Sequence, residues 1–431
     1  MIQTLKNAWK IEDLRRKILF TLLIILLYRI GNAIPVPYID RAALTSYFES
    51  NQGNILGLYN MMSGGAFSQA TIFALSIQPY INASIIIQLL CIAIPALERL
   101  SKEGGAEGRK KIASITRYAT VGIGLHMGFA YYMLIKNWGL IRGEGFWVAI
   151  VIILTFTSGS ALIMWLGEQI TEFGIGNGIS IILFASIMAR LPRTVLQTIQ
   201  NVGRPADDPN HLAWWIAVLM FLGALAIIVL IVYVNDAERR LPVQYAKRVV
   251  GRKMYGGQST FLPMKVNMSG VMPIIFASSI GTLPATIAGL AGASQDSWVN
   301  TWFGNSSIPY AIIYFLLIIF FAYFYSTIQF NPIEVSNNLK KNGGYIPGFR
   351  PGKPTSEFIQ KVLNKITLFG AIYLGIIAVT PILISHFSNA AQLTGLSLGG
   401  TSIMIAVGVA LETVRALEAQ MLMRNYKGFL D

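Results

Sequence analysis

Charged side chains are scarce in this sequence of 431 residues, where Asp, Glu, Lys and Arg together make up 13%. A soluble globular chain carries about 25% charged residues, so an ordinary water-exposed surface is excluded. Acidic residues are the scarcer sign, with 20 Asp and Glu against 34 Lys and Arg, which leaves a net charge of +14. Hydrophobic residues make up 54% of the chain. We therefore expect lipid to be its main solvent.

Cysteine and histidine are almost absent as well. The one cysteine, Cys91, lies inside an apolar segment. Because it is the only cysteine, a disulfide within the chain is excluded, and a cysteine-based metal site is not indicated. The three histidines are far apart, and neither G-x-S-x-G nor H-E-x-x-H occurs. In the run GFRPGKPT (348–355), proline follows Gly-Lys and the glycine spacing does not fit a phosphate-binding loop. We expect no catalysis and no cofactor, and any ATP-driven work falls to a partner.

Apolar segments of membrane-spanning length recur along the whole chain. Their number predicts an all-α polytopic membrane protein with ten transmembrane helices. The predicted spans run near 18–36, 73–97, 115–135, 147–167, 178–196, 212–234, 268–291, 308–329, 366–386 and 400–417.

Basic residues predict the orientation of these spans. With the N-terminus in the cytosol, 27 of the 34 Lys and Arg fall in the terminal segments and the cytosolic loops. Because positive charge marks cytosolic loops, both termini are expected there, with 1–17 as an amphipathic segment and 418–431 as a tail. A cleaved signal peptide is the alternative for the N-terminus, and its long polar region disfavours that reading.

Ten spans divide into two sets of five. Because five is odd, a second five-span unit enters the membrane from the opposite side, which is the inverted-repeat arrangement. We expect an N-terminal half over 18–200, a C-terminal half over 201–417 and a central pore between them. No repeat is visible residue by residue, so this symmetry rests on the count alone.

The segment 73–97 is apolar but carries amides, a serine and two prolines. Ile81 and Ile85 stand four apart, so on a helix they share a face, and their β-branched side chains are stiff. Two interpretations remain open from the residues alone. The pair lines an apolar constriction, or the helix packs among others with its amides bonded to neighbours.

Other polar residues in or beside the spans have plain explanations. Glu168 and Glu172 stand at a predicted cytosolic turn, where we expect them to be solvated. Glu412 and Arg415 are three apart, so they are expected to form an interfacial ion pair. Charged residues at mid-membrane, the usual mark of ion-coupled transport, are few.

Two long basic loops are predicted on the cytosolic side. In 235–267, apolar and β-branched residues alternate with basic ones, which predicts a short projecting hairpin. In 331–361, Pro-Gly pairs on either side of Arg350 predict rigid turns that hold it out. Such loops suit acidic partners such as a soluble protein or ribosomal RNA. The alternative is that they are solvated loops whose charge only sets the topology.

Seven segments in order resemble the SecY family of protein-translocation channels, over essentially the full length. They are PYINASIIIQLL (79–90), EGGAEGRKKIASITRY (103–118), ITEFGIGNGISIILF (170–184), ERRLPVQYAKR (238–248), KVNMSGVMPIIFASS (265–279), GYIPGFRPG (344–352) and GGTSIMIAVGVALE (399–412). Any one alone is a weak signal, and seven in order are highly specific.

The resemblance implies an hourglass pore closed by a ring of apolar side chains. The positions that match the ring are Ile81, Ile85, Ile179, Leu183, Ile275 and Ile405. It also implies a plug that fills the outer funnel and leaves easily, near 57–70. The plug candidates are Gly57, Asn60, Met61, Met62, Ser63, Gly64, Gly65, Ala66 and Phe67.

The family also opens sideways through a lateral gate. Asn267 matches a polar gate residue, and we expect Gln88 and Cys91 to be near candidates to face it. Arg350 matches a basic residue with which the family engages its translocation motor. Arg248 and Arg252 are weaker candidates for docking of the motor or the ribosome.

The function that the resemblance implies is passive conduction of unfolded polypeptide across, or into, the cytoplasmic membrane of a bacterium. The implied partners are SecE, SecG, the SecA ATPase, the ribosome and chains that bear signal sequences. A secondary transporter for a small solute is the alternative, and it requires a charged midplane site. An intramembrane protease is a second rival, for which His126 is the residue to test.

Overall fold

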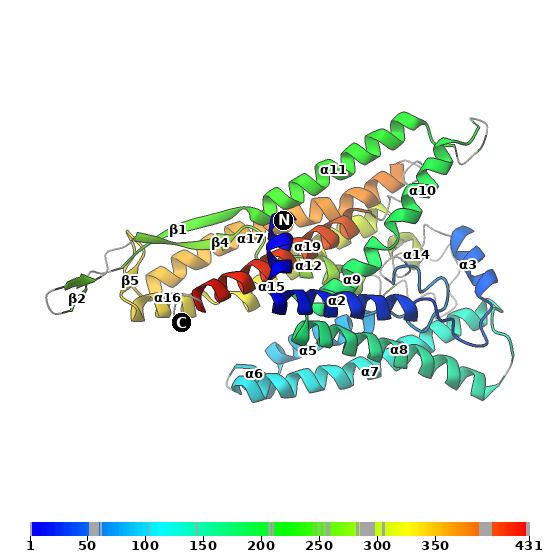
Figure 1. Cartoon of the computed structure of the whole chain (residues 1–431), viewed down its shortest axis with the longest axis horizontal. Helices are drawn as coiled ribbons and strands as arrows, with labels where there is room; N and C mark the ends of the chain where they lie inside the picture. The colour runs from blue at the N-terminus through cyan, green and yellow to red at the C-terminus, as the bar shows by residue number, and fades with distance from the viewer. Residues whose placement is uncertain are drawn as a thin grey trace.

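The structure, a computed structural model, is an elongated helix bundle with a strand-rich projection at one end (Figure 1). It describes residues 2–427 apart from 51–59, 61, 62, 103, 144, 206, 207, 209, 210, 246, 247, 251, 252, 256–258, 282, 283, 285–297, 304–306 and 388–398.

Six helices are long and apolar enough to cross a membrane in the described part of the chain, or seven if one bent pair counts as a span. They are α7 (Gly105–Asn137), α8 (Phe146–Phe173), α9 (Gly178–Met188) with α10 (Leu191–Val202), α11 (Trp214–Asp236), α15 (Ile308–Gln329) with α16 (Pro332–Lys341), and α17 (Lys353–Phe387). The bent pair is α5 (Gln78–Ala93) and α6 (Pro95–Lys102).

Three more helices coincide with predicted spans. Helix α2 (Glu12–Gly31) opens with a cluster of charged residues, which breaks the apolar length that a span needs. Helix α12 (Met272–Gly281) has ten residues, and α19 (Gly399–Lys427) contains charged residues along its second half. The count of ten spans therefore stays a prediction.

The predicted span 73–97 is wrong at both ends. Residues 63–77 form tight turns, in which Ala70 and Ser76 have positive φ, and the helix begins only at Gln78. Pro79 and Pro95 each stand in the first turn of a helix, and the chain bends by 106° between α5 and α6. Proline lacks the backbone N–H that a helix interior needs, so it begins a helix rather than continuing one.

The fold is not entirely helical, because the two loops predicted to be cytosolic form a sheet. The predicted hairpin is confirmed as β1 (Glu238–Tyr245) paired with β4 (Ser259–Lys265). A third strand, β5 (Gly344–Tyr345), comes from the other loop and gives the antiparallel order β4-β1-β5. Between β1 and β4 in the sequence, β2 (Arg248–Val250) pairs with β3 (Lys253–Tyr255) in a second, two-stranded sheet.

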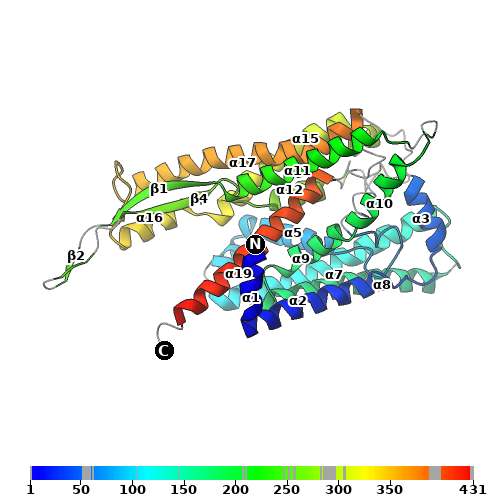
Figure 2. The same ribbon diagram turned by 45° about the horizontal axis from the view of Figure 1, so that its top comes forward.

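The helices form two outer groups with others between them (Figure 2). Helices α11, α15 and α17 lie on one side, and α2, α7 and α8 lie on the other. Helices α5, α9, α12 and α19 run between these groups. Apolar side chains from the central helices and from both outer groups join in one large buried cluster. The outer groups contribute Tyr28, Ile163, Tyr310 and Leu374 to it.

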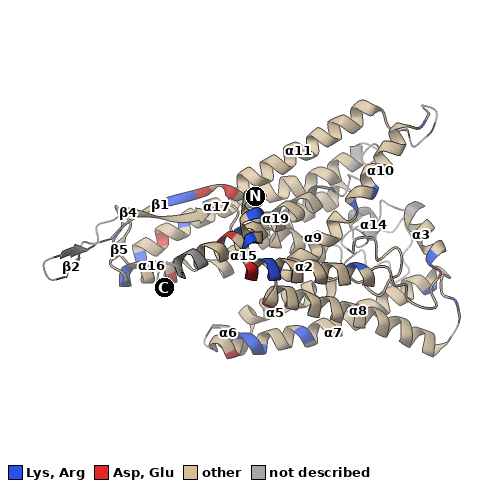
Figure 3. Cartoon of the chain, in the orientation of Figure 1, with Lys and Arg blue, Asp and Glu red and all other residues tan. Residues whose placement is uncertain are grey.

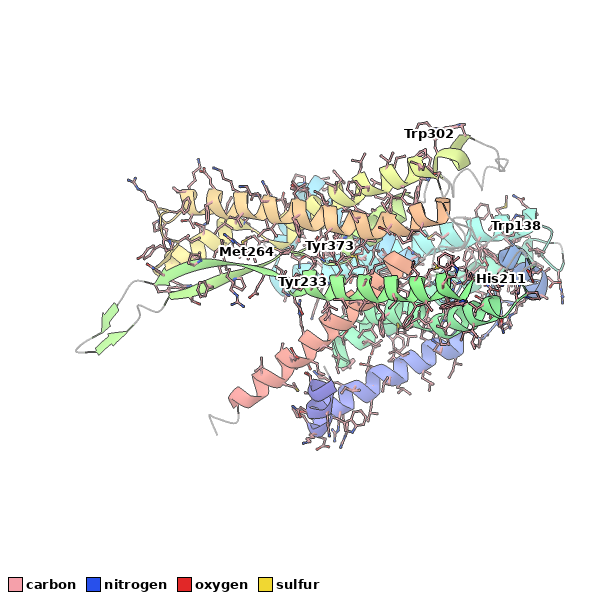
Figure 4. The ribbon with its side chains drawn as sticks, turned by 90° about the horizontal axis from the view of Figure 1, so that it is seen from above. Trp138, His211, Tyr233, Met264, Trp302 and Tyr373 are labelled. Atoms are coloured by element: carbon pink, nitrogen blue, oxygen red, sulfur yellow. The ribbon has the colours of Figure 1, made fainter. Side chains whose placement is uncertain are left out.

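Short helices complete the bundle. Helix α1 (Ile2–Lys10) packs against α2 and α19, with Ala8 fully buried. Helices α3 (Arg41–Ser50) and α14 (Trp298–Phe303) lie at the end opposite the sheet. Figure 4 shows Met264 on the hairpin and Trp138 and His211 at the far end.

Candidate functional site

The six residues predicted to form a ring converge from four helices. Helix α5 supplies two of them, α9 two, α12 one and α19 one. Five are buried and the sixth, Ile179, packs partly buried against the same cluster; the exposures are Ile81 6%, Ile85 4%, Leu183 2%, Ile275 6% and Ile405 5%. None of these side chains carries a polar atom. The ring candidates are therefore buried or partly buried, and apolar throughout.

Local contacts explain how α9 places its two ring candidates. Asn177 caps the helix, and its side-chain oxygen accepts from the backbone N–H of Ile179 at 3.1 Å and of Ser180 at 3.3 Å. A Cβ on Gly178 would lie 2.0 Å from the carbonyl oxygen of Gly167, so only glycine lets α9 approach α8 this closely.

The plug candidates are only partly described. Gly57, Met61 and Met62 lie outside the described residues. Asn60 holds the turn that follows it: its side-chain oxygen accepts from the N–H of Ser68 at 2.9 Å, and its carbonyl accepts from Gly65 at 2.8 Å. The hydroxyl of Ser63 accepts from the N–H of Phe67 at 3.0 Å.

Packing ties this segment to its surroundings. Gly64 lies so close to α9 that an added Cβ would stand 3.0 Å from the carbonyl oxygen of Ser186. The Phe67 ring stacks on Tyr131 with centroids 4.3 Å apart, and the Tyr131 hydroxyl donates to the Phe67 carbonyl. The resemblance implied a plug here, but it did not indicate this anchor at Phe67.

The gate candidates lie on α5 and just before α12, two helices that pack against each other. Gln88 donates to the Ser84 hydroxyl at 3.2 Å on its own helix, and Cys91 is half-buried. Asn267 is 8% exposed, and its amide donates to the side-chain oxygen of Asn235 at 2.9 Å. The partner of Asn267 thus stands at the end of α11, a residue that sequence reasoning missed.

Two expectations about charged residues are wrong. Arg415 does not pair with Glu412; it forms an ion pair with Asp236 and donates to the Asn235 carbonyl at 3.0 Å. Glu168 lies on α8 and pairs with Arg117 of α7 at 2.8 Å. In both cases the partner comes from a different helix, which spacing along one helix cannot indicate.

The docking candidates lie on the sheet end of the molecule. Arg350 is exposed in a turn between Gly348 and Gly352, both with positive φ, and its carbonyl accepts from the Thr355 hydroxyl at 2.8 Å. Phe349 stacks on Phe358 with centroids 4.1 Å apart. The turn predicted at Arg350 is present and exposes this residue, while its rigidity stays a prediction.

The two basic loops form one unit. Gln244 and Tyr345 are paired in the sheet, and the Tyr345 hydroxyl donates to the Gln244 side chain at 2.9 Å. Met264 from one loop and Ile346 from the other are buried in the same small cluster. Arg248 lies on β2, where its side chain is not described, and Arg252 lies outside the described residues.

Basic residues gather at the end of the molecule that carries the sheet, α6 and the start of α2 (Figure 3). At the opposite end, a hydrogen bond from Arg142 lowers the pKa of the Asp40 carboxyl from its ordinary value. Trp302 at that end is exposed, as is typical of a membrane interface.

The described residues contain no cluster of metal-binding side chains and no catalytic arrangement of histidines. No group of three or more His, Cys, Asp or Glu that could hold a metal ion occurs among them. His126 is exposed on α7, and His211 bonds to the Arg204 carbonyl at 2.8 Å. The protease reading of His126 therefore has no support from its surroundings.

Known proteins share both the sequence and the fold. A model of the SecY family matches residues 71–414. The protein translocase subunit SecY of Streptomyces coelicolor is 44% identical over 446 residues and that of Mycobacterium bovis 43% over 451, each alignment covering 100% of both chains.

Solved structures agree on the fold. A protein-conducting channel has a TM-score of 0.62 at 17% identity, covering 94% of this chain and 92% of that one. The idle yeast Ssh1 complex bound to the 80S ribosome has a TM-score of 0.63 at 15% identity, covering 95% and 89%. Because the family model spans most of the chain and the relatives match it over its full length, this chain belongs to the SecY family.

Proposed function

We propose that this chain is the central pore-forming subunit of a bacterial protein translocase, which conducts unfolded polypeptides across the membrane and releases transmembrane segments sideways into lipid. The observation that supports the proposal is that the ring candidates are apolar and belong to, or pack against, one large buried cluster. They are Ile81, Ile85, Leu183, Ile275 and Ile405 within it and Ile179 against it.

The chemistry of this cluster suits a pore for extended chains. A narrow apolar rim expels water and so blocks ions, yet it offers no hydrogen bond that would hold a passing polypeptide. A solute transporter instead needs charged or polar groups at the midplane. Among the described residues, the buried polar side chains are Ser, Thr, Gln78 and Asn267, and none is charged, so nothing there favours that alternative.

The channel is proposed to have ten spans in two inverted halves with both termini in the cytosol. The layered arrangement of helices supports the two halves, and the basic end that carries the sheet supports the orientation. In this arrangement α5 and α12 face each other across the lateral gate, with Gln88, Cys91 and Asn267 as its polar residues. Residues near 57–70 act as the plug.

The partners supply the work, since the chain carries no nucleotide-binding motif. SecA and the ribosome are proposed to dock on the sheet end through Arg350, Arg248 and Arg252, and SecE and SecG to flank the helices in the membrane. The exposure of Arg350 supports this proposal, as does the likeness of the fold to the yeast Ssh1 complex, which is bound to a ribosome.

Crosslinking to a secretory chain arrested in passage tests the pore. A photoreactive residue at Ile85 or Ile275 is expected to attach to the arrested chain, because both side chains line the proposed constriction. Leu222 on α11 is the control, since it is 58% exposed on a helix with an almost wholly exposed surface. Equal crosslinking from Leu222 and Ile85, or none from the ring positions, contradicts the proposal.

A further inference from the structure

Polar side chains meet at the junction between the hairpin and the membrane helices. Asn235 and Asp236 are the last residues of α11, Asn267 precedes α12, and Arg415 lies on α19. The Arg415 guanidinium binds both the Asn235 carbonyl and the Asp236 carboxylate, and the Asn235 side chain accepts from Asn267. We call these four residues the junction.

The junction continues the ladder of the hairpin. The paired strands run from Gln244 opposite Ser259 to Glu238 opposite Lys265. The next contact is a backbone bond from Val266 to the Ala237 carbonyl at 3.0 Å, followed by the Asn267–Asn235 bond at 2.9 Å. No gap separates the hairpin from Asn267, so a tilt of the hairpin acts directly on Asn267, which a short turn over residues 268–271 joins to α12.

Burial makes this connection stiff. Asn267 is 8% exposed, and its side-chain oxygen is buried without a hydrogen-bond partner. Breaking its one bond leaves a buried amide unsatisfied, which is costly. Arg415 adds charge-assisted bonds that hold the end of α11, and a planar guanidinium binding two acceptors restrains their geometry.

We propose that Arg415 is a positioning residue, which holds the end of α11 so that movement of the hairpin is passed through Asn235 and Asn267 to α12. The inference rests on the proposed function for its purpose, since α12 is there a wall of the lateral gate. The partner that drives it is a macromolecule that binds the basic sheet end.

The functional test compares secretion of a weak and a strong signal sequence. Arg415→Gln is expected to change the ratio of the two by about fivefold, the lower range of coupling between linked sites. Because both residues act through one connection, Arg415→Gln is expected to add little in an Asn267→Ala background. The exchange Arg415→Asp with Asp236→Arg should restore the part of the ratio that depends on the ion pair, since an aspartate at 415 cannot donate to the Asn235 carbonyl.

Arg142→Gln is the matched control. It breaks an ion pair with Asp40 at 2.8 Å at the opposite end of the molecule, and the ratio is expected to stay unchanged. Thermal unfolding of each variant separates loss of coupling from loss of fold, and the exchange variant keeps the test valid if Arg415→Gln does not fold.

A second measurement does not depend on secretion. In a Cys91→Ser background, spin labels at Thr260 of the hairpin and Leu222 of α11 report how firmly the hairpin is held. Arg415→Gln is expected to broaden their distance distribution. Broadening with an unchanged ratio would overturn the inference, because the junction would then be structural only. An unchanged distance distribution also overturns the inference. If the distribution broadens but Ile85 and Ile275 do not crosslink to an arrested chain, the proposed function fails and the stiff junction stands.

Discussion

A single tyrosine sets how much of the proposed plug can move. Tyr131 is 3% exposed, stacks on Phe67 and donates to its carbonyl, while Phe48 and Phe156 pack around them. Aromatic contacts of this kind add to the area that they bury. We infer that displacement is confined to the residues before Phe67, and that the expected easy release of the whole segment does not extend past this anchor.

Tyr131→Phe should weaken the seal of the resting channel. The change keeps the stacked ring but removes one of two donors to the Phe67 carbonyl, which still accepts from the Ala70 N–H at 3.1 Å. We expect this loss to cost about 0.5–1.5 kcal/mol. Ion flux through resting channels in proteoliposomes is expected to rise. Tyr132→Phe, at a half-buried neighbouring position, should leave the flux at the wild-type level. Equal flux in Tyr131→Phe and wild type would refute the anchor.

At the scale of elements, two loops that are distant in sequence act as one surface. β5 extends the hairpin sheet, and the Ser336 hydroxyl of α16 donates to the Gly352 carbonyl at 2.8 Å, which fixes the turn that carries Arg350. The turn that carries Arg350 is therefore held beside the strands β1 and β4. A partner that docks on Arg350 meets the hairpin at the same time.

Arg350→Glu is expected to abolish SecA-driven secretion in a reconstituted assay. The side chain is exposed, so the substitution reverses a docking charge without disturbing the buried cluster beneath it. Lys353→Glu, an equal charge change at an exposed position three residues away, should reduce secretion much less. Normal secretion by Arg350→Glu would remove this residue from the mechanism.

For the whole molecule, the distribution of charge predicts one orientation in the membrane. The sheet end gathers the basic residues, and positive charge is retained on the cytosolic side. Single cysteines in a Cys91→Ser background test this with a membrane-impermeant maleimide. Positions Lys6, Thr260 and Leu422 should label only from the cytosolic side, and Lys136 only from the outside. Labelling of Thr260 and Lys136 from one side contradicts the topology.

Apolar length, basic clusters and alternation were enough to predict a membrane protein, the position of most helices, the hairpin and the exposed Arg350 turn. Each of these is a property of one segment and its solvent, so it can be read without knowing the neighbours. The resemblance added the six ring positions, which the residues alone left between a constriction and ordinary helix packing.

Tertiary structure decided which distant groups meet. Arg415 pairs with Asp236, 179 residues away in the sequence, although Glu412 lies on its own helix. Glu168 pairs with Arg117 on α7. Gly344–Tyr345 joined β1, and Phe67 was anchored on Tyr131. Spacing within a helix shows which side chains share a face, but the packing of the bundle determines what that face meets.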